Sequence, residues 1–165
     1  MNNNKHLPLF GVGPLYGIIV ILLTAVFFML SIFGYLDSGL VNETWAFVIF
    51  IILGVLSIIL GLYLWIPSAL YKKNIDYYIK KNELCVTGRY EICRNPCYSG
   101  IMFVCIGILL FAHNLWLLIL PIFYYLLMSV MMIFSEEKWL EDQYGETYLN
   151  YKKKVNRVIP WFKKK

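Results

Sequence analysis

Charge is scarce in this sequence. Only 15% of the 165 residues are Asp, Glu, Lys or Arg, whereas ordinary soluble domains carry about 25%. At the same time 60% of the residues are hydrophobic and 18% are aromatic. A soluble domain of this length has too little interior to bury so much apolar surface, so we expect lipid to solvate much of the chain. The net charge of +5 then favours a membrane surface over nucleic acid as the partner.

Familiar cofactor and metal motifs are also missing. The sequence contains no Rossmann glycine fingerprint, P-loop, HExxH or GxSxG, so nucleotide binding through such frameworks has no support. Its four cysteines lack the CxxC spacing of zinc and redox sites, and we expect free thiols and no metal: Cys85, Cys93, Cys97 and Cys105. These residue patterns identify no catalytic residue.

Apolar runs make up most of the chain. They cover residues 15–35, 45–66, 96–112 and 115–134, and all but the third approach the ~20 residues that a helix needs to cross a bilayer. We predict an all-α membrane protein with four transmembrane helices, the last two forming a hairpin. The whole chain, residues 1–165, is expected to be a single integral membrane domain.

Three prolines and one connecting segment carry further predictions. Pro67 should end the second run, Pro96 should open the third helix, and Pro121 should kink the fourth. Residues 71–84 place Ile75, Tyr78 and Ile79 on one side of a helix, with lysines flanking them, as is typical of a helix lying in the membrane interface.

Lysine and arginine are absent from two of the connections. None of the 15 lies in residues 36–44 or at the turn His113–Asn114; all lie in the N-terminus, in residues 68–98 or beyond residue 134. The positive-inside rule therefore predicts a multi-pass protein, in the cell membrane, with both termini cytoplasmic. A three-span arrangement would leave the basic segments on opposite faces. Residues 68–98 and 135–165 would then form a cytoplasmic cap.

Two polar segments flank the predicted hairpin, and its turn should bring them together. Glu136 and Glu137 stand at the exit of the last run, about 100° apart on a helix, so only one can easily face the bundle. Each is otherwise expected to be solvated, as charges at helix ends commonly are. Arg94 is either an interface anchor or the partner of an acid in the cap.

A longer pattern joins these segments. It reads Gly88-x-Tyr90-x-x-x-Arg94-Asn95-Pro96-x-Tyr98, a hydrophobic hairpin, Glu136-Glu137, then Tyr144-Gly145-Glu146 and Ile159-Pro160. This pattern resembles the isoprenylcysteine carboxyl methyltransferase family, to which the phospholipid N-methyltransferases are related. It covers residues 82–162, about half of the chain.

The resemblance implies S-adenosylmethionine-dependent methyl transfer at the cytoplasmic membrane face. The acceptor would be a lipophilic substrate from the bilayer or a small molecule, and membrane lipids would be the other partners. Two alternatives stay open: a phospholipid amine N-methyltransferase, and a non-catalytic membrane scaffold that retains the fold. A transporter is disfavoured because the apolar runs carry no charge.

The resemblance also implies the residues that contact the cofactor. Glu136 would be the acid that does so, with Glu137 beside it, and residues 82–85 would act through backbone groups. The full set is Asn82, Glu83, Leu84, Cys85, Tyr90, Arg94, Asn95, Pro96, Cys97, Tyr98, Glu136 and Glu137.

The chain departs from that family's pattern at two positions. Asn95 stands where the family usually has histidine, and an amide side chain hydrogen-bonds but does not titrate. Met132 stands where the prenylcysteine enzymes place an arginine for the substrate carboxylate. The second departure weakens a prenylcysteine as the substrate and leaves the predicted fold and cofactor unchanged.

Overall fold

A computed structural model of the protein describes residues 11–70, 77–78 and 81–160. This part of the chain is helical and contains no β-strand, which confirms the predicted all-α class. The expected interface helix at residues 71–84 falls largely outside the described residues. The α-helices are α1 (Gly13–Ile32), α2 (Thr44–Leu70), α4 (Pro96–Phe111), α5 (Ile119–Phe134), α6 (Glu136–Tyr144) and α7 (Glu146–Lys154), and the 3-10 turns are η1 (Asp37–Gly39), η2 (Gly88–Glu91) and η3 (Leu115–Leu118).

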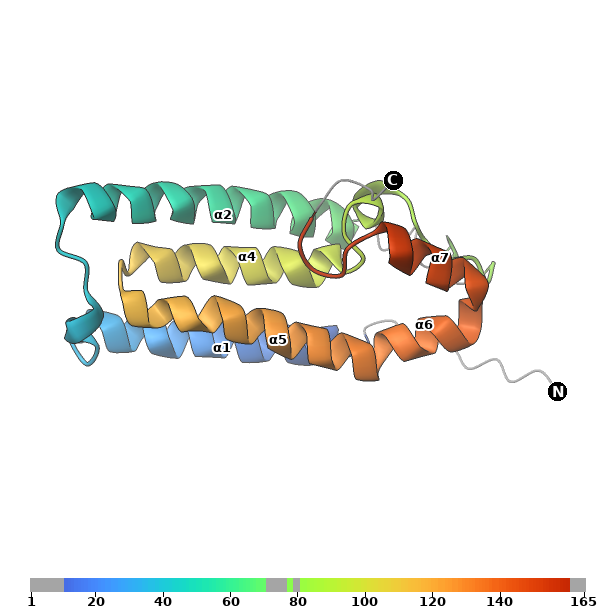
Figure 1. The fold of residues 1–165 in the computed structure, drawn as a ribbon, viewed down its shortest axis with the longest axis horizontal. Coiled ribbons are helices and arrows are strands. Elements are labelled where there is room, and N and C mark those ends of the chain that lie inside the picture. Colours follow the sequence, from blue (N-terminus) through green and yellow to red (C-terminus); the bar gives the residue numbers. More distant parts are fainter. Residues whose placement is uncertain (1–10, 71–76, 79–80, 161–165) are drawn as a thin grey trace.

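Four long helices lie side by side as a bundle (Figure 1). Three helical segments are long and apolar enough to cross a membrane: Gly13–Ile32, Thr44–Leu70 and Leu115–Tyr144. In the last of these the apolar part ends at Phe134, and α6 continues beyond it. Helix α4 is also apolar but has 16 residues, or about 24 Å at 1.5 Å per residue. The chain is therefore a membrane protein by helix length and composition, and a fourth crossing by α4 stays a prediction.

Of the three predictions about prolines, the structure confirms the one for Pro96 and differs from the other two. Pro96 is the first residue of α4, as predicted. Pro67 does not end its helix, because α2 continues to Leu70; just beyond it, the Ser68 hydroxyl donates to the Leu64 carbonyl at 2.6 Å. Pro121 lies in the first turn of α5, directly after η3, so the expected kink is a change from 3-10 to α geometry where the helix begins.

Helices α2 and α4 approach each other through glycines. A Cβ added at Gly61 would lie 2.7 Å from the carbonyl oxygen of Gly100, and one at Gly100 would lie 2.8 Å from that of Gly61. Gly54 and Gly107 form an equivalent pair further along the same two helices. Since lipid gives helices no hydrophobic reason to associate, close backbone packing at small residues is what holds such a pair together.

Gly61→Ala is expected to lower the melting temperature in detergent and to loosen the α2–α4 pair, because the new methyl group meets backbone atoms that cannot move aside alone. Overpacking of this kind costs about 1–3 kcal/mol. Gly17→Ala is the matched control: a Cβ there would be 3.6 Å from Ile101, an ordinary contact. Equal melting temperatures for the two variants would contradict this packing.

Helices α1 and α5 meet α4 around a buried polar network. Tyr16 and Tyr124 have no exposed surface. The Tyr124 and Thr24 hydroxyls lie 2.8 Å apart, and the Tyr16 hydroxyl donates to the Tyr124 carbonyl at 3.4 Å. Met132 is fully buried in the same core, so it serves here as a packing residue.

Asn114 closes the end of the bundle at which α1–α2 and α4–α5 are connected. Its side chain is 1% exposed, donates to the Ser31 hydroxyl at 3.0 Å and the Leu36 carbonyl at 2.9 Å, and accepts from the Trp116 N–H at 3.0 Å. The Val41 N–H donates to the His113 carbonyl beside it. One amide thus ties the two connections together.

We expect Asn114→Ala to destabilise the protein by about 1–3 kcal/mol, since it removes the buried amide and leaves the buried Ser31 hydroxyl without this donor. Thermal melting of the detergent-solubilised protein measures the loss. The control is Asn150→Ala on the exposed face of α7, which should change stability by less than about 0.5 kcal/mol. Similar losses for both would mean that the amide network contributes nothing.

Candidate functional site

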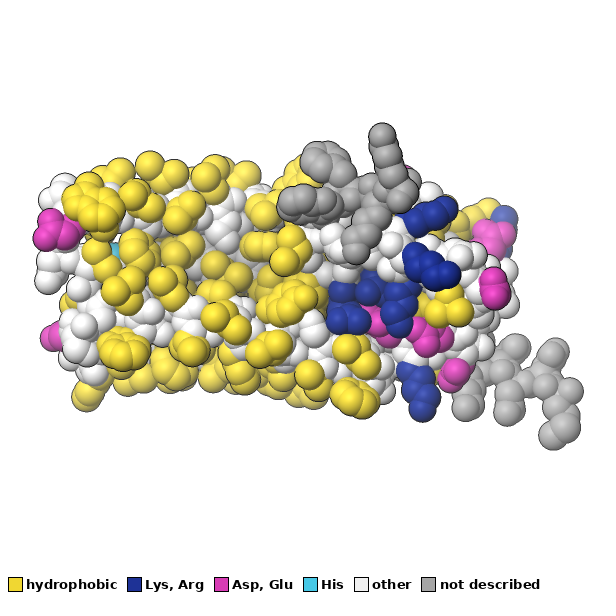
Figure 2. All heavy atoms as spheres, viewed as in Figure 1, with side chains coloured by type: hydrophobic (Ala, Val, Ile, Leu, Met, Phe, Trp, Pro, Cys, Tyr) yellow, Lys and Arg dark blue, Asp and Glu magenta, His cyan; other side chains and the backbone are white. Residues whose placement is uncertain are grey.

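The opposite end of the bundle carries the charged groups. There η2, α6, α7 and residues 155–160 pack together, and we call this region the polar end (Figure 1). On the face drawn in Figure 2, lysine and arginine side chains gather at the polar end and hydrophobic side chains cover the rest of the bundle. The hairpin therefore brings the two polar segments together as predicted: Tyr98 contacts Glu136, and Asn82 contacts Gln143.

Glu136 joins three separate parts of the chain. Its Oε1 accepts hydrogen bonds from the Val12 backbone N–H at 3.1 Å and from the Tyr98 hydroxyl at 2.9 Å. A Cβ at Gly11 would overlap the Glu136 carboxylate, and one at Gly13 would overlap the Tyr98 ring. The start of α1 therefore lies directly against the pair formed by Glu136 and Tyr98.

The carboxylate of Glu136 is left partly unsatisfied by this arrangement. No described residue other than Val12 and Tyr98 hydrogen-bonds to it, so Oε2 can accept a further donor. Burial raises the pKa of Glu136, and the hydrogen bonds from Tyr98 and Val12 oppose that rise. A half-buried acid whose ionised form is only partly compensated attracts a cation or an ammonium group.

Glu137 points to different partners. Its side chain is 4% exposed and pairs with Arg94 at 3.2 Å, with Lys152 at 3.3 Å and with Arg157. Burial alone would raise the pKa of Glu137, but the hydrogen bond from Arg157 and the charges of Arg94 and Arg157 outweigh it and hold that pKa below its usual value. The two adjacent acids are thus engaged on different faces, as their 100° separation requires.

Arg94 is part of this ion cluster rather than a lone interface anchor. Its side chain is 7% exposed, and it also donates to the Tyr148 hydroxyl at 3.1 Å. The side-chain amide of Asn95 donates to the Arg157 carbonyl at 3.1 Å. Both residues therefore hold the segment that follows α7, and a contact of either with a cofactor stays a prediction.

The other predicted site residues, all within the described part of the chain, form no ion pair with this cluster. Asn82 adopts a left-handed backbone with φ 55° and accepts a hydrogen bond from Gln143 on α6 at 2.8 Å. The carbonyl of Tyr90 accepts from the Tyr151 hydroxyl at 2.6 Å. Of the remaining residues, Glu83 is exposed and Pro96 is buried. Three are half-buried: Leu84, Cys85 and Cys97.

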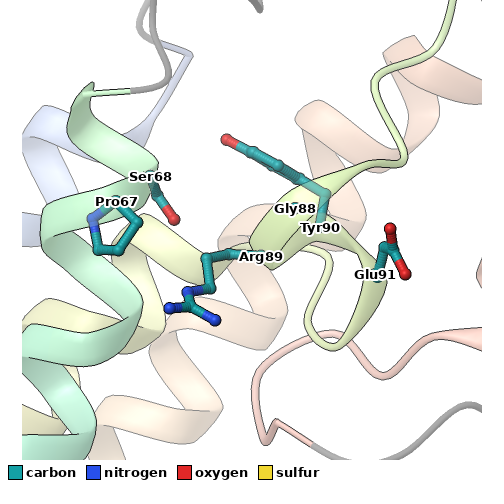
Figure 3. A pocket seen from close by; sticks show the side chains of 6 residues that line it. All are labelled: Pro67, Ser68, Gly88, Arg89, Tyr90 and Glu91. Carbon is teal, nitrogen blue, oxygen red and sulfur yellow. The ribbon is translucent and has the colours of Figure 1, made fainter.

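A pocket opens between the end of α2 and η2 (Figure 3). It has a volume of about 350 Å³. The residues that line it are Pro67, Ser68, Gly88, Arg89, Tyr90 and Glu91. Burial raises the pKa of Tyr90, and nearby thiols and Glu136 raise it further. Tyr90 thus lines this pocket and is also close enough to Glu136 to be affected by its charge.

Sequence reasoning missed several residues of the polar end. Val12 contributes only a backbone N–H, and the flanking Gly11 and Gly13 are the one signal that could have indicated a close approach. Lys152 and Arg157 belong to the cluster through contacts distant in sequence, and no local pattern marks them. Among residues 11–70, 77–78 and 81–160, no group of three or more His, Cys, Asp or Glu side chains is arranged to hold a metal.

The fold and the polar end thus define an α-helical membrane protein with an acidic and aromatic site beside its helix ends. The chain belongs to the phospholipid methyltransferase family, whose model matches residues 49–147. This is the family related to the isoprenylcysteine carboxyl methyltransferases, which the sequence pattern resembles. Membership indicates a membrane methyltransferase. No curated protein and no solved structure matches the chain.

Proposed function

We propose that the protein is an integral membrane methyltransferase that uses S-adenosylmethionine and methylates a lipid-soluble acceptor. The observation that carries the proposal is the Glu136–Tyr98 pair: a half-buried carboxylate fixed through one oxygen, whose other oxygen accepts no hydrogen bond from the described part of the chain. The family match over residues 49–147 supports the reaction class.

The residues of this site suit the proposed cofactor. S-adenosylmethionine carries an ammonium group and a sulfonium, and both are attracted by a carboxylate and by aromatic faces. Glu136 Oε2 would accept from the ammonium group, while Tyr98 and Tyr90 would contribute aromatic surface. Because Val12 and Tyr98 already hold Oε1, the carboxylate keeps its orientation without spending binding energy on it.

The cofactor, when bound, supplies a methyl group already activated on sulfur. The protein's part is then to align donor and acceptor and to exclude water. The ion cluster around Glu137 does this indirectly, because it holds α6 and residues 155–160 against the start of α4. A carboxylate or thiolate acceptor needs no general base, whereas an amine must first lose a proton.

A phospholipid amine is the acceptor that the family match favours. Met132 is buried in the core, so its position offers no cation for a prenylcysteine carboxylate. The isoprenylcysteine-like reaction is the second candidate, motivated by the motif from Gly88 to Tyr98. A non-catalytic scaffold would retain the same fold and bind no cofactor.

The same proposal includes the topology. Helix α4, with α1, α2 and α5, would make four crossings, and both termini with the polar end would lie on the cytoplasmic side. The absence of Lys and Arg from residues 36–44 and 113–114 supports this orientation.

Calorimetric titration of the detergent-solubilised protein with S-adenosylmethionine tests the proposal. We expect saturable binding that S-adenosylhomocysteine abolishes by competition. Absence of heat, together with absence of competition in a parallel assay with labelled cofactor, would overturn the proposed function and leave the scaffold alternative.

A further inference from the structure

Among the described residues that line the pocket between α2 and η2, Arg89 is the one that carries a positive charge. Its guanidinium lies 3.5 Å from the centre of the Tyr63 ring. Its Nε is buried without a hydrogen-bond partner, and among the described residues no carboxylate pairs with it. Figure 3 shows Arg89 directed toward Pro67 on α2, with the Glu91 side chain on the other side of η2.

The contact with the Tyr63 ring holds the guanidinium in place through its face. Its N–H groups, which lie around the edge of that plane, remain free to donate hydrogen bonds. A planar guanidinium on an aromatic face is pre-organised, so it loses little freedom when it binds a phosphate oxygen through two parallel hydrogen bonds. A buried guanidinium nitrogen that has no hydrogen-bond partner and no acidic partner among the described residues is costly, and binding of an anion would satisfy it. We therefore expect the ligand of this pocket to be an anion.

The surroundings indicate a lipid rather than a soluble anion. The pocket adjoins the last turns of α2, where Ile66 and Leu70 are 48% and 78% exposed. These side chains offer apolar surface to acyl chains on the same helix end that contributes Pro67 and Ser68 to the pocket. The volume of about 350 Å³ is within the range of small-molecule sites.

We propose that the pocket between α2 and η2 binds the phosphodiester of a membrane phospholipid, with Arg89, held by Tyr63, as the phosphate ligand. This inference rests on the proposed function and deepens it: the bound lipid is the methyl acceptor or is positioned as one. Tyr90 lines this pocket and is influenced by the charge of Glu136, so it would connect the phosphate site with the proposed site of the methyl donor.

Binding of tail-labelled phosphatidylethanolamine to the full-length protein in detergent tests the proposal. Arg89→Gln is expected to weaken binding about tenfold or more, as loss of a charged hydrogen-bond donor does, and Arg89→Lys should recover part of it. Lys138→Gln, an exposed cation on α6, is the matched control and should bind like the parent. Tail-labelled diacylglycerol, which lacks the phosphate, should bind the parent and Arg89→Gln equally weakly.

The other outcomes identify other ligands. Equal affinity of the parent and Arg89→Gln for phosphatidylethanolamine would overturn the proposal. Displacement of the lipid by millimolar inorganic phosphate would show that the site takes a free anion, and displacement by S-adenosylhomocysteine would assign the pocket to the cofactor; each contradicts a lipid site. Calorimetry with S-adenosylmethionine on the same variants separates the two claims, because failure of the parent to bind it overturns the proposed function, whereas the Arg89 result tests only the lipid site.

Discussion

Glu136→Gln is expected to weaken binding of S-adenosylmethionine by roughly 10- to 100-fold. Glutamine keeps an oxygen that can accept from Val12 and Tyr98, so the local structure should persist, but it loses the charge that attracts the ammonium group. Hydrogen bonds to charged groups contribute about 1.5–3 kcal/mol, which corresponds to this range of affinity. Calorimetry at neutral pH measures the change.

The matched control is Glu146→Gln, the same substitution at an exposed glutamate on α7. It should bind the cofactor like the parent. Binding by the parent should also weaken on acidification at a higher pH than an ordinary glutamate would give, because the pKa of Glu136 is raised by burial. Unchanged affinity of Glu136→Gln would show that the site is misassigned, even if the protein binds S-adenosylmethionine.

The largest effect on stability is expected from Glu137→Gln. This change leaves the buried guanidinium of Arg94 without its counter-charge and removes the shared partner of Arg157 and Lys152. Breaking a buried ion pair from one side costs about 3–5 kcal/mol. The melting temperature of the purified protein in detergent at pH 7 measures it.

Glu141→Gln is the control, because Glu141 also pairs with Lys152 but is 36% exposed. Exposed pairs contribute about 0–1 kcal/mol, so its melting temperature should stay close to that of the parent. Equal losses for the two variants would mean that burial of the Glu137 cluster contributes nothing.

The same cluster fixes the direction of a pH effect. The pKa of Glu137 is lower in the folded protein than its usual value, which is about 4.3 for an unfolded chain. Its contribution to stability is therefore present above that pH and is lost as the pH falls through the lower, folded-state value. The stability difference between the parent and Glu137→Gln should shrink in that acidic range, and a difference independent of pH there would contradict the ion-pair account.

Much of the fold could be predicted from the sequence, because lipid-facing helices have a strong compositional signal. The apolar runs, the hairpin turn at His113–Asn114 and the role of Pro96 as a helix opener all follow from local rules. The prediction that Pro67 ends its helix is wrong, because α2 runs to Leu70. A membrane helix can continue through a proline when neighbouring groups satisfy the freed backbone.

The site was harder to predict because its contacts join residues far apart in sequence. The motif brought Glu136 and Tyr98 to notice, and the structure does place them in hydrogen-bond contact. The sequence does not indicate that Glu136 and Glu137 have different partners, because those partners, Val12 at the start of α1 and Arg157, are distant in sequence. Arg89 carried no signal because its partner Tyr63 belongs to an apolar run that reads as a plain membrane helix.

Transfer of a labelled methyl group from S-adenosylmethionine into a total lipid extract is the most direct test of the central claim. The parent protein and Glu146→Gln should place label in the lipid fraction, and Glu136→Gln should lose most of that activity. Absence of label with the parent, in membranes where the protein binds the cofactor, would contradict methyl transfer to a lipid. Equal labelling by the parent and Glu136→Gln would contradict the site.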